Sequence, residues 1–393
     1  MTTRNVYVDN NATTMIAPEV VEEMEPFLRE LYGNPSSMHL FGGQVKKYVD
    51  RAREKVAALI NADPSEVLFT SCGTESDNAA IRGVLAAHPE KRHIITSRVE
   101  HPAVKNVCQH LGKNGYRVTE LSVDKAGRID LDELKEKLDP DTALVTIMWA
   151  NNETGVIFPI EKIARMVKSA GALFHCDAVQ AAGKIPIDMQ RVPVDLLSLS
   201  GHKLHAPKGI GVLYLRKGTL FVPFIMGGHQ EGGRRAGTEN VPYIVGLGKA
   251  CELAAEKIGG EIAAVKALRD RLERELLDKA IDASVNGDQE NRLPNTTNIS
   301  FKYIEGESIL ILLSEEGIAA SSGSACTSGS LEPSHVLRAM GVPFTRVHGS
   351  VRFSLSRYNT EKDISYIIEH MLDIEKKLRE ISPFGREELN AGH

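Results

Sequence analysis

The chain has 393 residues, of which 42% are hydrophobic and 25% are charged, and its formal net charge is -5, which is typical of a large globular domain with a smaller one. Because it has no run of Lys and Arg and no apolar run of about 20 residues, we expect no binding to nucleic acid and no membrane span. The first residues lack the pattern of a signal peptide, so we expect a cytoplasmic protein.

Short apolar strands alternate with amphipathic helices in the first half of the chain. The predicted strands cover residues 65–71, 92–97, 116–123, 142–150, 172–178, 194–200 and 209–217. The predicted helices between them cover residues 74–88, 102–115, 130–138 and 160–171. This alternation predicts a doubly wound α/β domain, in which a mostly parallel seven-stranded sheet lies between helices.

The pattern changes near residue 255. Residues 261–281 place apolar side chains on one stripe, which predicts a long helix. Three later stretches predict short strands with helices between them: residues 295–301, 307–317 and 350–360. We therefore expect a large α/β domain over residues 14–255 and a smaller α+β domain formed by residues 1–13 and 256–393.

Ligands of open α/β sheets bind beyond the carboxyl ends of the strands, so the residues that follow each strand are candidates. Gly73 and Thr74 begin a helix after a strand, where N–H groups and a hydroxyl can bind a phosphate. Asp177 ends an apolar strand, where a carboxylate is costly unless a cation such as a protonated pyridine nitrogen faces it. Taken singly, these residues are better explained by a plain strand-to-helix turn and, for Asp177, by a helix cap or a surface turn.

Lys203 follows another apolar strand and lies between two histidines. A lysine in such a place can lose its proton near neutral pH and form a Schiff base, although an exposed loop lysine is the alternative. Ser200 and His202 add hydrogen-bond donors beside it. A phosphate-binding turn, a buried acid and a lysine at strand ends of one sheet are the three anchors that pyridoxal 5'-phosphate needs, so we predict this cofactor.

Two further strand ends carry candidate residues. His101 follows one strand, where an imidazole can stack on a ring and move protons. Asn151 and Asn152 follow another, where an amide can hold a ring oxygen or a substrate carboxylate. A structural histidine and turn-forming asparagines are the alternatives for these residues.

The five cysteines are Cys72, Cys108, Cys176, Cys251 and Cys326. They are widely spaced without a C-x-x-C pair, so we predict neither a disulfide framework nor a structural zinc site. The first four lie in or beside predicted strands and helices, and we interpret them as small buried residues. Cys326 differs, because its neighbours in SSGSACTSGS offer a thiol almost nothing to pack against.

Several motifs occur in the order found in the NifS/IscS-type cysteine desulfurases: YVDNNATT, GNPSSMH, CGTESDN, EHPAV, NNETG, DAVQAAGKIPID, SLSGHKLHAPKG, RRAGTEN and SSGSACTSGS. The similarity extends from about Val6 to about Tyr358, and CGTESDN, MWANNETG and GHKLHAPKG are most similar to the NifS branch. The resemblance implies a fold-type I pyridoxal-phosphate enzyme of the class-V aminotransferase family that works as a homodimer.

The resemblance also implies which residues bind the cofactor. Lys203 would carry it, Asp177 would pair with the ring nitrogen and Gln180 would contact the ring hydroxyl. The other cofactor residues would be His101 and Asn152 at the ring, and Thr74, Ser200 and His202 at the phosphate. Thr238 would reach the phosphate in the other subunit's site.

For the substrate, the resemblance implies that Arg352 binds the carboxylate of L-cysteine, with Asn152 beside the cofactor. Lys203 would remove the α-proton, and the thiolate of Cys326 would take the sulfur as a persulfide, which leaves L-alanine. His101 is a candidate partner for the proton of this thiol. The Gly and Ser residues of the loop, about 321–333, would give it the freedom to deliver sulfur. The expected acceptor is an iron–sulfur scaffold protein, for nitrogenase or for general cluster assembly.

Three alternatives stay open. A selenocysteine lyase or an aminotransferase would share the cofactor anchors but would not need Cys326. A non-catalytic protein that only receives sulfur would have no use for those anchors. A zinc hydrolase or metal-binding module lacks an H-E-x-x-H pair or equivalent spacing here, and its ligands would be His175, Cys176, Asp177, His202 and His205.

Overall fold

The structure is a computed structural model that describes residues 4–322 and 333–382. Its centre is a seven-stranded sheet with the order β2-β8-β7-β6-β5-β3-β4. Neighbouring strands from β7 to β4 are parallel, whereas β8 is antiparallel to both β7 and β2. The strands are β2 (Val67–Thr70), β3 (His93–Ser97), β4 (Arg117–Leu121), β5 (Thr142–Thr146), β6 (Leu173–Asp177), β7 (Leu196–Ser200) and β8 (Gly211–Leu215). The predicted sheet of seven mostly parallel strands is confirmed.

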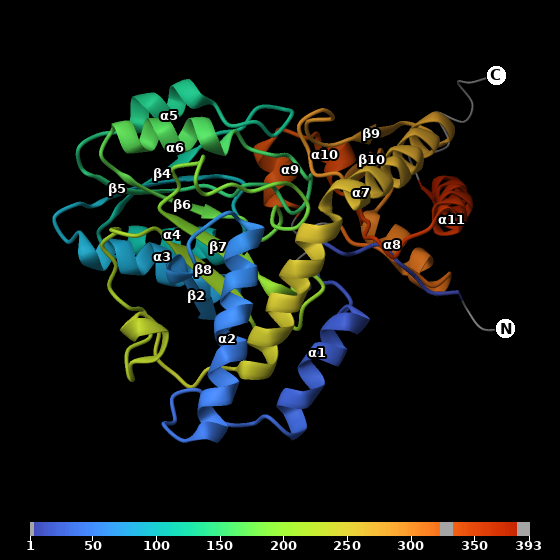
Figure 1. Cartoon of the computed structure of the whole chain (residues 1–393). Helices are drawn as coiled ribbons and strands as arrows, with labels where there is room; N and C mark the ends of the chain where they lie inside the picture. Colours follow the sequence, from blue (N-terminus) through green and yellow to red (C-terminus); the bar gives the residue numbers. More distant parts are fainter. Residues whose placement is uncertain (1–3, 323–332, 383–393) are drawn as a thin grey trace.

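Helices cover both faces of this sheet (Figure 1). They are α2 (Leu40–Leu59), α3 (Gly73–Ala87), α4 (Pro102–Lys113), α5 (Leu131–Lys137) and α6 (Ile160–Ser169). Successive strand residues point to opposite faces, and both faces are apolar: Leu68 packs with α3 and α4, whereas Phe69 packs in the cluster that contains α2 and α6. Burial on both faces explains why the strands are continuous apolar runs in the sequence.

A smaller group of elements lies beside this layered part (Figure 1). Its sheets have the orders β12-β10-β9 and β1-β11, and its core, which includes Leu272, Phe301 and Phe353, forms a separate apolar cluster. Its elements are β1 (Val6–Tyr7), β9 (Ala283–Val285), β10 (Thr296–Phe301), α8 (Gly306–Glu315), β11 (Ile318–Ala319), β12 (Ser350–Ser354) and α11 (Glu361–Ile381). The strands predicted within 295–301 and 350–360 are confirmed.

The strand predicted at residues 307–317 is wrong, because most of this stretch belongs to helix α8. Ile309 and Leu313, four residues apart, are buried, whereas Ile311 between them is 61% exposed. That spacing is one face of a helix. A short apolar run does not by itself distinguish a buried strand from a buried helix, which is the reason for the error.

Helix α7 (Val241–Lys279) joins the two parts and contributes side chains to both apolar clusters (Figure 1). The sequence predicted only its second half, because glycine is unfavourable inside helices. Gly248 is required for packing, since a Cβ atom there would lie 2.7 Å from Cα of Ala52 in α2. The boundary expected after residue 255 falls inside α7, and the division into domains stays a prediction.

The remaining elements are short or lie at the ends of the two parts. They are α1 (Pro18–Arg29), α9 (His335–Ala339), α10 (Phe344–Val347) and the 3-10 turns η1 (Pro64–Glu66), η2 (Gly201–Lys203) and η3 (Gln230–Gly233). Among the helices of the described ranges, none combines the length and the apolar character needed to cross a membrane.

Candidate active site

A cavity of about 370 Å³ lies where β5, β6 and β7 end. The predicted site residues that line it are Gly73, Thr74, His101, Asn152, Asp177, Gln180, Ser200, His202, Lys203 and Arg352. Three candidate residues are not among them. Asn151 is buried, and its Oδ1 atom accepts the N–H groups of Glu153 and Thr154 at 2.9 and 3.0 Å, as in a turn-forming asparagine. Thr238 lines a neighbouring cavity of about 160 Å³, and Cys326 lies outside the described residues. One cavity therefore gathers the predicted anchors of cofactor and substrate from segments far apart in the chain.

Asp177 is the last residue of β6 and is buried in the wall of this cavity. Burial raises the pKa of its carboxyl to about 6. Two effects oppose this rise: the hydrogen bond from the Val179 N–H group, at 2.9 Å, and the positive charge of Lys203 both lower the pKa. A buried carboxylate is stabilised most by a cation placed against it. The protonated ring nitrogen of pyridoxal phosphate is such a cation, so Asp177 fits the cofactor.

Lys203 lies in the single turn η2, directly after β7. Its Nζ atom donates to the carbonyl oxygens of Asn11 and Ala12, at 2.5 and 2.6 Å. These two residues follow β1, so the amino-terminal segment of the chain fixes the place of the amine. An amine that is held by neutral acceptors at a cavity with a buried acid is suited to bind an aldehyde.

Two histidines in the cavity wall are neutral near pH 7. Burial and the positive charge of Lys203 lower the pKa of both His101 and His202 to about 4. Nδ1 of His101 accepts the N–H of Ala103 at 3.2 Å at the start of α4, so the ring proton is assigned to Nε2. Nδ1 of His202 lies 3.2 Å from Oγ1 of Thr13. Neutral imidazoles can stack on a ring and exchange protons with a ligand.

The amino-terminal end of α3 is a candidate anion site in the cavity. Helix α3 begins at Gly73, and the N–H groups of a first helical turn attract anions. Gly73 keeps this place open, because a Cβ atom there would lie 2.8 Å from Cγ2 of Val179 and 3.4 Å from Cβ of Ser200. Together with the side chains of Thr74 and His202, which line the same cavity, this donor set fits a phosphate group.

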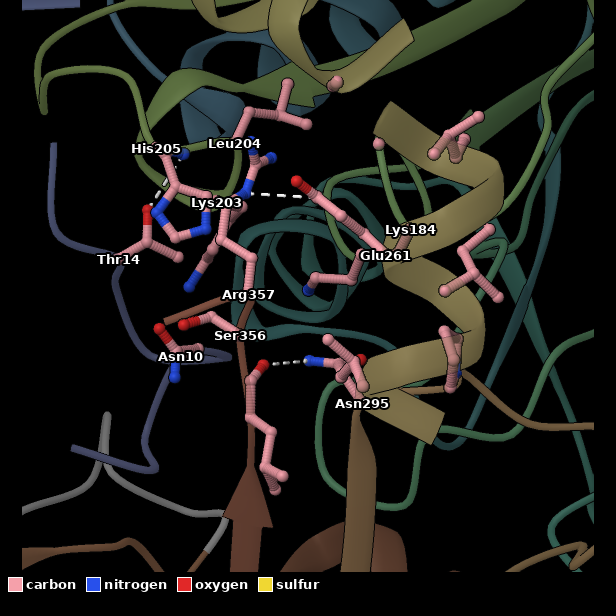
Figure 2. A pocket seen from close by; sticks show the side chains of 17 residues that line it. Asn10, Thr14, Lys184, Lys203, Leu204, His205, Glu261, Asn295, Ser356 and Arg357 are labelled. Carbon is pink, nitrogen blue, oxygen red and sulfur yellow. Dashed lines mark hydrogen bonds and ion pairs between the residues drawn. The ribbon is translucent and has the colours of Figure 1, made fainter. Parts of the chain in front are cut away.

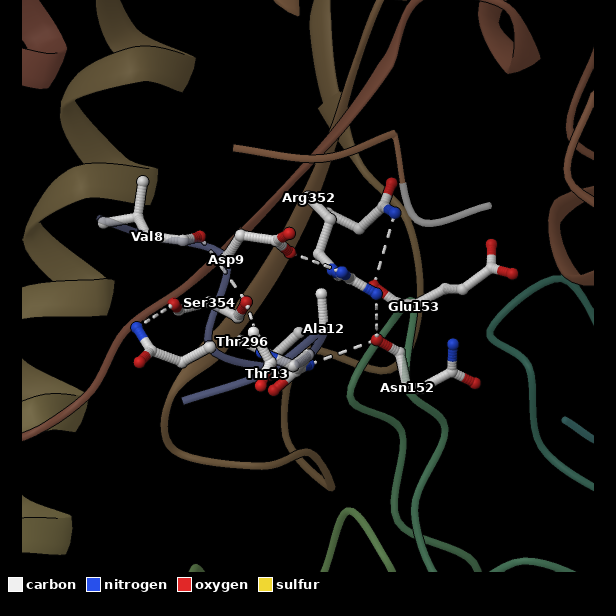
Figure 3. Close-up of polar contacts among 12 residues, drawn as sticks. Val8, Asp9, Ala12, Thr13, Asn152, Glu153, Thr296, Arg352 and Ser354 are labelled. Carbon is white, nitrogen blue, oxygen red and sulfur yellow. Dashed lines mark hydrogen bonds and ion pairs between the residues drawn. The ribbon is translucent and has the colours of Figure 1, made fainter. Parts of the chain in front are cut away.

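Arg352 lies in β12 and its side chain is 2% exposed. Its Nη2 atom is 2.6 Å from Oδ1 of Asp9, and its Nη1 atom donates to the carbonyl oxygen of Asn152 at 2.9 Å (Figure 3). Its Nε atom has no hydrogen-bond partner among the described residues. A guanidinium in the cavity wall, held in place by Asp9 and Asn152, is suited to bind a carboxylate.

The segment 9–14, DNNATT, which belongs to the motif YVDNNATT but received no role from the sequence, lies against the site residues. Its contacts reach Lys203, Arg352 and His202; for example, Oγ1 of Thr14 donates to the carbonyl oxygen of His202 at 3.0 Å. The sequence gives one signal, since polar residues directly after an apolar strand are candidates at any sheet edge. Nothing local indicates their partners.

Asp77 in α3 is a second acid of the cavity that the sequence analysis missed. Its carboxyl is buried, and Oδ1 lies 3.5 Å from Nε2 of His175 without a hydrogen-bond partner among the described residues. Burial, together with the negative charge of Asp177, raises the pKa of Asp77 well above its usual range. An acid among the buried positions of an apolar helix was the available signal.

The zinc alternative has no ligand set in the part of the chain that the structure describes, where no three His, Cys, Asp or Glu side chains are grouped as metal ligands. His175 lies between the hydroxyls of Thr146 and Ser198, at 2.8 and 2.9 Å. Burial lowers its pKa to about 3.

The prediction that four cysteines are buried is confirmed for Cys108, Cys176 and Cys251, and burial raises the pKa of each of these thiols. It is wrong for Cys72, which is half-buried and lines the cavity. Cys72 precedes α3, and its Sγ atom accepts the N–H of Glu75 at 3.4 Å. The Cys72 thiol caps helix α3, and the sequence did not indicate this role, because cysteine is not a typical helix cap.

A second and smaller cavity of about 60 Å³ adjoins Lys203 on the side of α7 (Figure 2). Glu261 of α7 and Arg357, which follows β12, form an ion pair at 3.1 Å in its wall. Lys184 and Asn295 also line this cavity. It lies where the layered part, α7 and the smaller group of elements meet.

Comparison with known proteins agrees with this geometry. The family aminotransferase class-V matches residues 6–367. A cysteine desulfurase of Trichormus azollae is 64% identical over 98% of this chain and 96% of its own length. The cysteine desulfurase NifS of Azotobacter vinelandii is 57% identical over 97% of this chain and 95% of its own. A solved structure titled NifS-like protein is 42% identical, covers 95% of this chain and 100% of its own, and has a TM-score of 0.90.

Proposed function

Because the chain belongs to the aminotransferase class-V family and, within it, to the cysteine desulfurases, we propose that it takes the sulfur from L-cysteine and releases L-alanine, with pyridoxal 5'-phosphate as its cofactor. One observation carries the proposal. The cavity of about 370 Å³ joins an amine, Lys203, a buried acid, Asp177, and the anion site at Gly73. These are the three groups that the aldehyde, the ring nitrogen and the phosphate of this cofactor require.

Different residues of the cavity would bind different parts of the cofactor. Lys203 would carry it through its amino group, Asp177 would pair with the ring nitrogen and Gln180 would contact the ring hydroxyl. His101 and Asn152 would hold the ring, and Gly73, Thr74, Ser200 and His202 would bind the phosphate. When bound, the cofactor supplies an electron-withdrawing ring that makes the α-proton of the amino acid removable.

The chain's own side chains then act on the substrate. Arg352 binds the carboxylate of cysteine and so fixes which bond at the α-carbon faces Lys203. The amino group of L-cysteine would replace Lys203 on the cofactor, and the Nζ atom of Lys203, freed in this way, would take the α-proton. His101 is neutral at pH 7, since its pKa is about 4, and its ring is the candidate acceptor for the proton of the Cys326 thiol.

Cys326 is the proposed sulfur acceptor, on a loop of about residues 321–333. Its thiolate attacks the substrate's sulfur, so a sulfur–sulfur bond forms while the carbon–sulfur bond breaks. The electron pair of the broken bond stays with the β-carbon, which gains a proton. Lys203 returns a proton to the α-carbon, and the product leaves as alanine. The persulfide on Cys326 then passes to an iron–sulfur scaffold protein, for nitrogenase or for other clusters.

A cytoplasmic homodimer completes the proposal. Thr238 lies in a cavity separate from that of Lys203 in its own chain, which supports a role toward the phosphate of the other subunit's site. A selenocysteine lyase or another pyridoxal enzyme is the alternative, because it would use the same anchors.

The test is the release of alanine and sulfide from L-cysteine in the presence of a thiol reductant. We expect equal amounts from the wild type, and neither product from Cys326→Ala although this variant still binds the cofactor and is yellow. Cys72→Ser tests the other thiol near the cofactor. Sulfide release that persists in Cys326→Ala would favour the selenocysteine lyase. Loss of sulfide release in Cys72→Ser but not in Cys326→Ala would identify Cys72, in the cavity wall, as the nucleophile.

A further inference from the structure

The side chain of Asn11 uses its full hydrogen-bonding capacity although it is buried. Its Nδ2 atom donates to the carbonyl oxygen of Asn152 at 3.1 Å and to Oγ1 of Thr296 at 2.9 Å. Its Oδ1 atom accepts from Nζ of Lys184 at 3.2 Å and from Nδ2 of Asn295 at 3.1 Å. An amide can donate two bonds and accept two through its oxygen, so all four places are used and the side chain has one orientation.

The backbone of the same residue reaches the cofactor site. The carbonyl oxygen of Asn11 accepts from Nζ of Lys203 at 2.5 Å and from Nε2 of Gln180 at 2.9 Å. Its N–H group donates to Oγ of Ser354 in β12 at 2.9 Å. The carbonyl that holds the amine of Lys203 is therefore placed by the side chain and the N–H group of its own residue.

Asn11 is also connected to the arginine of the substrate site. The carbonyl oxygen of Asn152 accepts from Nδ2 of Asn11 and from Nη1 of Arg352, at 3.1 and 2.9 Å. Figure 3 shows Arg352 and Asn152 in this arrangement. One residue thus contacts the lysine directly and the arginine through a single shared carbonyl.

We propose that Asn11 is a positioning residue that holds the amine of Lys203 and the guanidinium of Arg352 in fixed relation across the cavity. The inference rests on the proposed function, in which these two groups bind the cofactor and the substrate carboxylate. Asn11 lines the cavity, but its side chain is fully engaged by four protein partners. It acts through Lys203, Gln180 and Asn152, and its partners Thr296, Asn295 and Ser354 tie this arrangement to the smaller group of elements.

Removal of the side chain should loosen both groups at once. Asn11→Ala deletes four hydrogen bonds, and of the contacts that place the carbonyl of residue 11 only the N–H bond to Ser354 remains. Loss of residues that orient a reacting group typically costs about 10- to 100-fold in binding or rate. We expect a loss of this size in the affinity for pyridoxal phosphate, a higher KM for L-cysteine and a lower kcat.

Two further variants separate positioning from stability. Asn10→Ala is the matched control, because the Asn10 side chain is buried in the same segment and donates to the carbonyl oxygen of Ser354 at 2.9 Å, with no bond to Lys203, Gln180 or Asn152. Thr296→Val removes one acceptor of Asn11 from a strand that does not line the cavity. It should shift the same quantities as Asn11→Ala in the same direction, by a smaller factor.

The experiment titrates cofactor-free protein with pyridoxal phosphate, follows the absorbance of the bound cofactor, and then measures KM and kcat. The proposal is supported if Asn11→Ala and Thr296→Val bind the cofactor more weakly and have a raised KM, while Asn10→Ala keeps the wild-type values of both. Wild-type cofactor affinity and KM in both variants overturn it while the proposed function stands. Equal losses in all three variants overturn it as well, since they indicate stability alone. A wild type that binds no pyridoxal phosphate would instead refute the proposed function.

Discussion

The guanidinium of Arg352 and the carboxylate of Asp9 form an ion pair at 2.6 Å although 343 residues separate them in the chain. The pair joins β12 to the segment that follows β1, and the arginine side chain is 2% exposed. A buried guanidinium without its counter-ion is costly. The pair therefore stabilises the junction and also orients the group that we propose to bind the substrate carboxylate.

Asp9→Asn keeps the shape of the side chain but leaves the charge of Arg352 buried without an anion. We expect the free energy of unfolding of the cofactor-free protein to fall by about 3 kcal/mol, measured by urea denaturation. Asp50→Asn is the control, because Asp50 pairs with Lys46 at 3.0 Å on the surface, where such a pair contributes less than about 1 kcal/mol. Equal effects of the two substitutions would show that Arg352 does not depend on Asp9.

The carboxyl of Asp177 makes the stability of the cofactor-free protein depend on pH. Its pKa in the folded protein is about 6, above the ordinary value of 3.8, so the folded state holds the proton more tightly than the unfolded chain. The ionised carboxylate of Asp177 therefore destabilises the folded protein. This destabilisation develops as the pH rises from about 4 to above about 6, and it is absent at lower pH.

Asp177→Asn removes this cost. We expect the variant to unfold at a higher urea concentration than the wild type at about pH 8, and the difference to shrink toward about pH 4. The same variant should bind pyridoxal phosphate more weakly, because the amide cannot neutralise a protonated ring nitrogen. A variant that is less stable than the wild type at about pH 8 would contradict the raised pKa.

Gly73→Ala tests the anion site at the start of α3. The new methyl group would meet Val179 at 2.8 Å and the Cβ atom of Ser200 at 3.4 Å. We expect the affinity for pyridoxal phosphate to fall about tenfold or more, measured by titration of the cofactor-free protein. Gly43→Ala is the matched control in helix α2, since nothing lies within 4 Å of its added Cβ atom. It should leave cofactor binding unchanged and stabilise the helix by up to about 1 kcal/mol. Unchanged affinity for pyridoxal phosphate in Gly73→Ala would show that the phosphate does not bind at the start of α3.

Mixed dimers test the proposed role of Thr238. We expect Lys203→Ala and Thr238→Ala to be inactive or weakly active when each is purified alone. If Thr238 serves the partner's site, refolding the two together creates dimers in which one site carries both defects and the other carries none. Activity should then rise above the sum of the parents. No gain, in a mixture shown to contain mixed dimers, would place the function of Thr238 in its own chain.

The gathering of Lys203, Asp177 and Gly73 in one cavity could be predicted from the sequence, because each follows a strand and the carboxyl ends of parallel strands meet at one edge. The role of Asn11 could not. Its partner Thr296 is 285 residues away, and an Asn after a short strand is typical of any turn. The position of Thr238 relative to the partner's site could not be predicted either, because one sequence does not show how two subunits pack.

Helices α7 and α8 show the same limit in the fold. Gly248 interrupts the helical pattern because it packs closely against Ala52 of α2, a contact that local propensity does not contain. The apolar run of α8 was assigned to a strand because burial on one helix face depends on neighbours that lie elsewhere in the chain. Local pattern identified most strands and helices, and tertiary packing decided these two.

The most direct test of the account is to locate the cofactor on the chain. The purified protein, loaded with pyridoxal phosphate, is reduced with borohydride and digested, and the modified peptide is identified by mass spectrometry. We expect the label to lie on Lys203. A label on Lys184, the other lysine that contacts Asn11, or no stable label at all would contradict it.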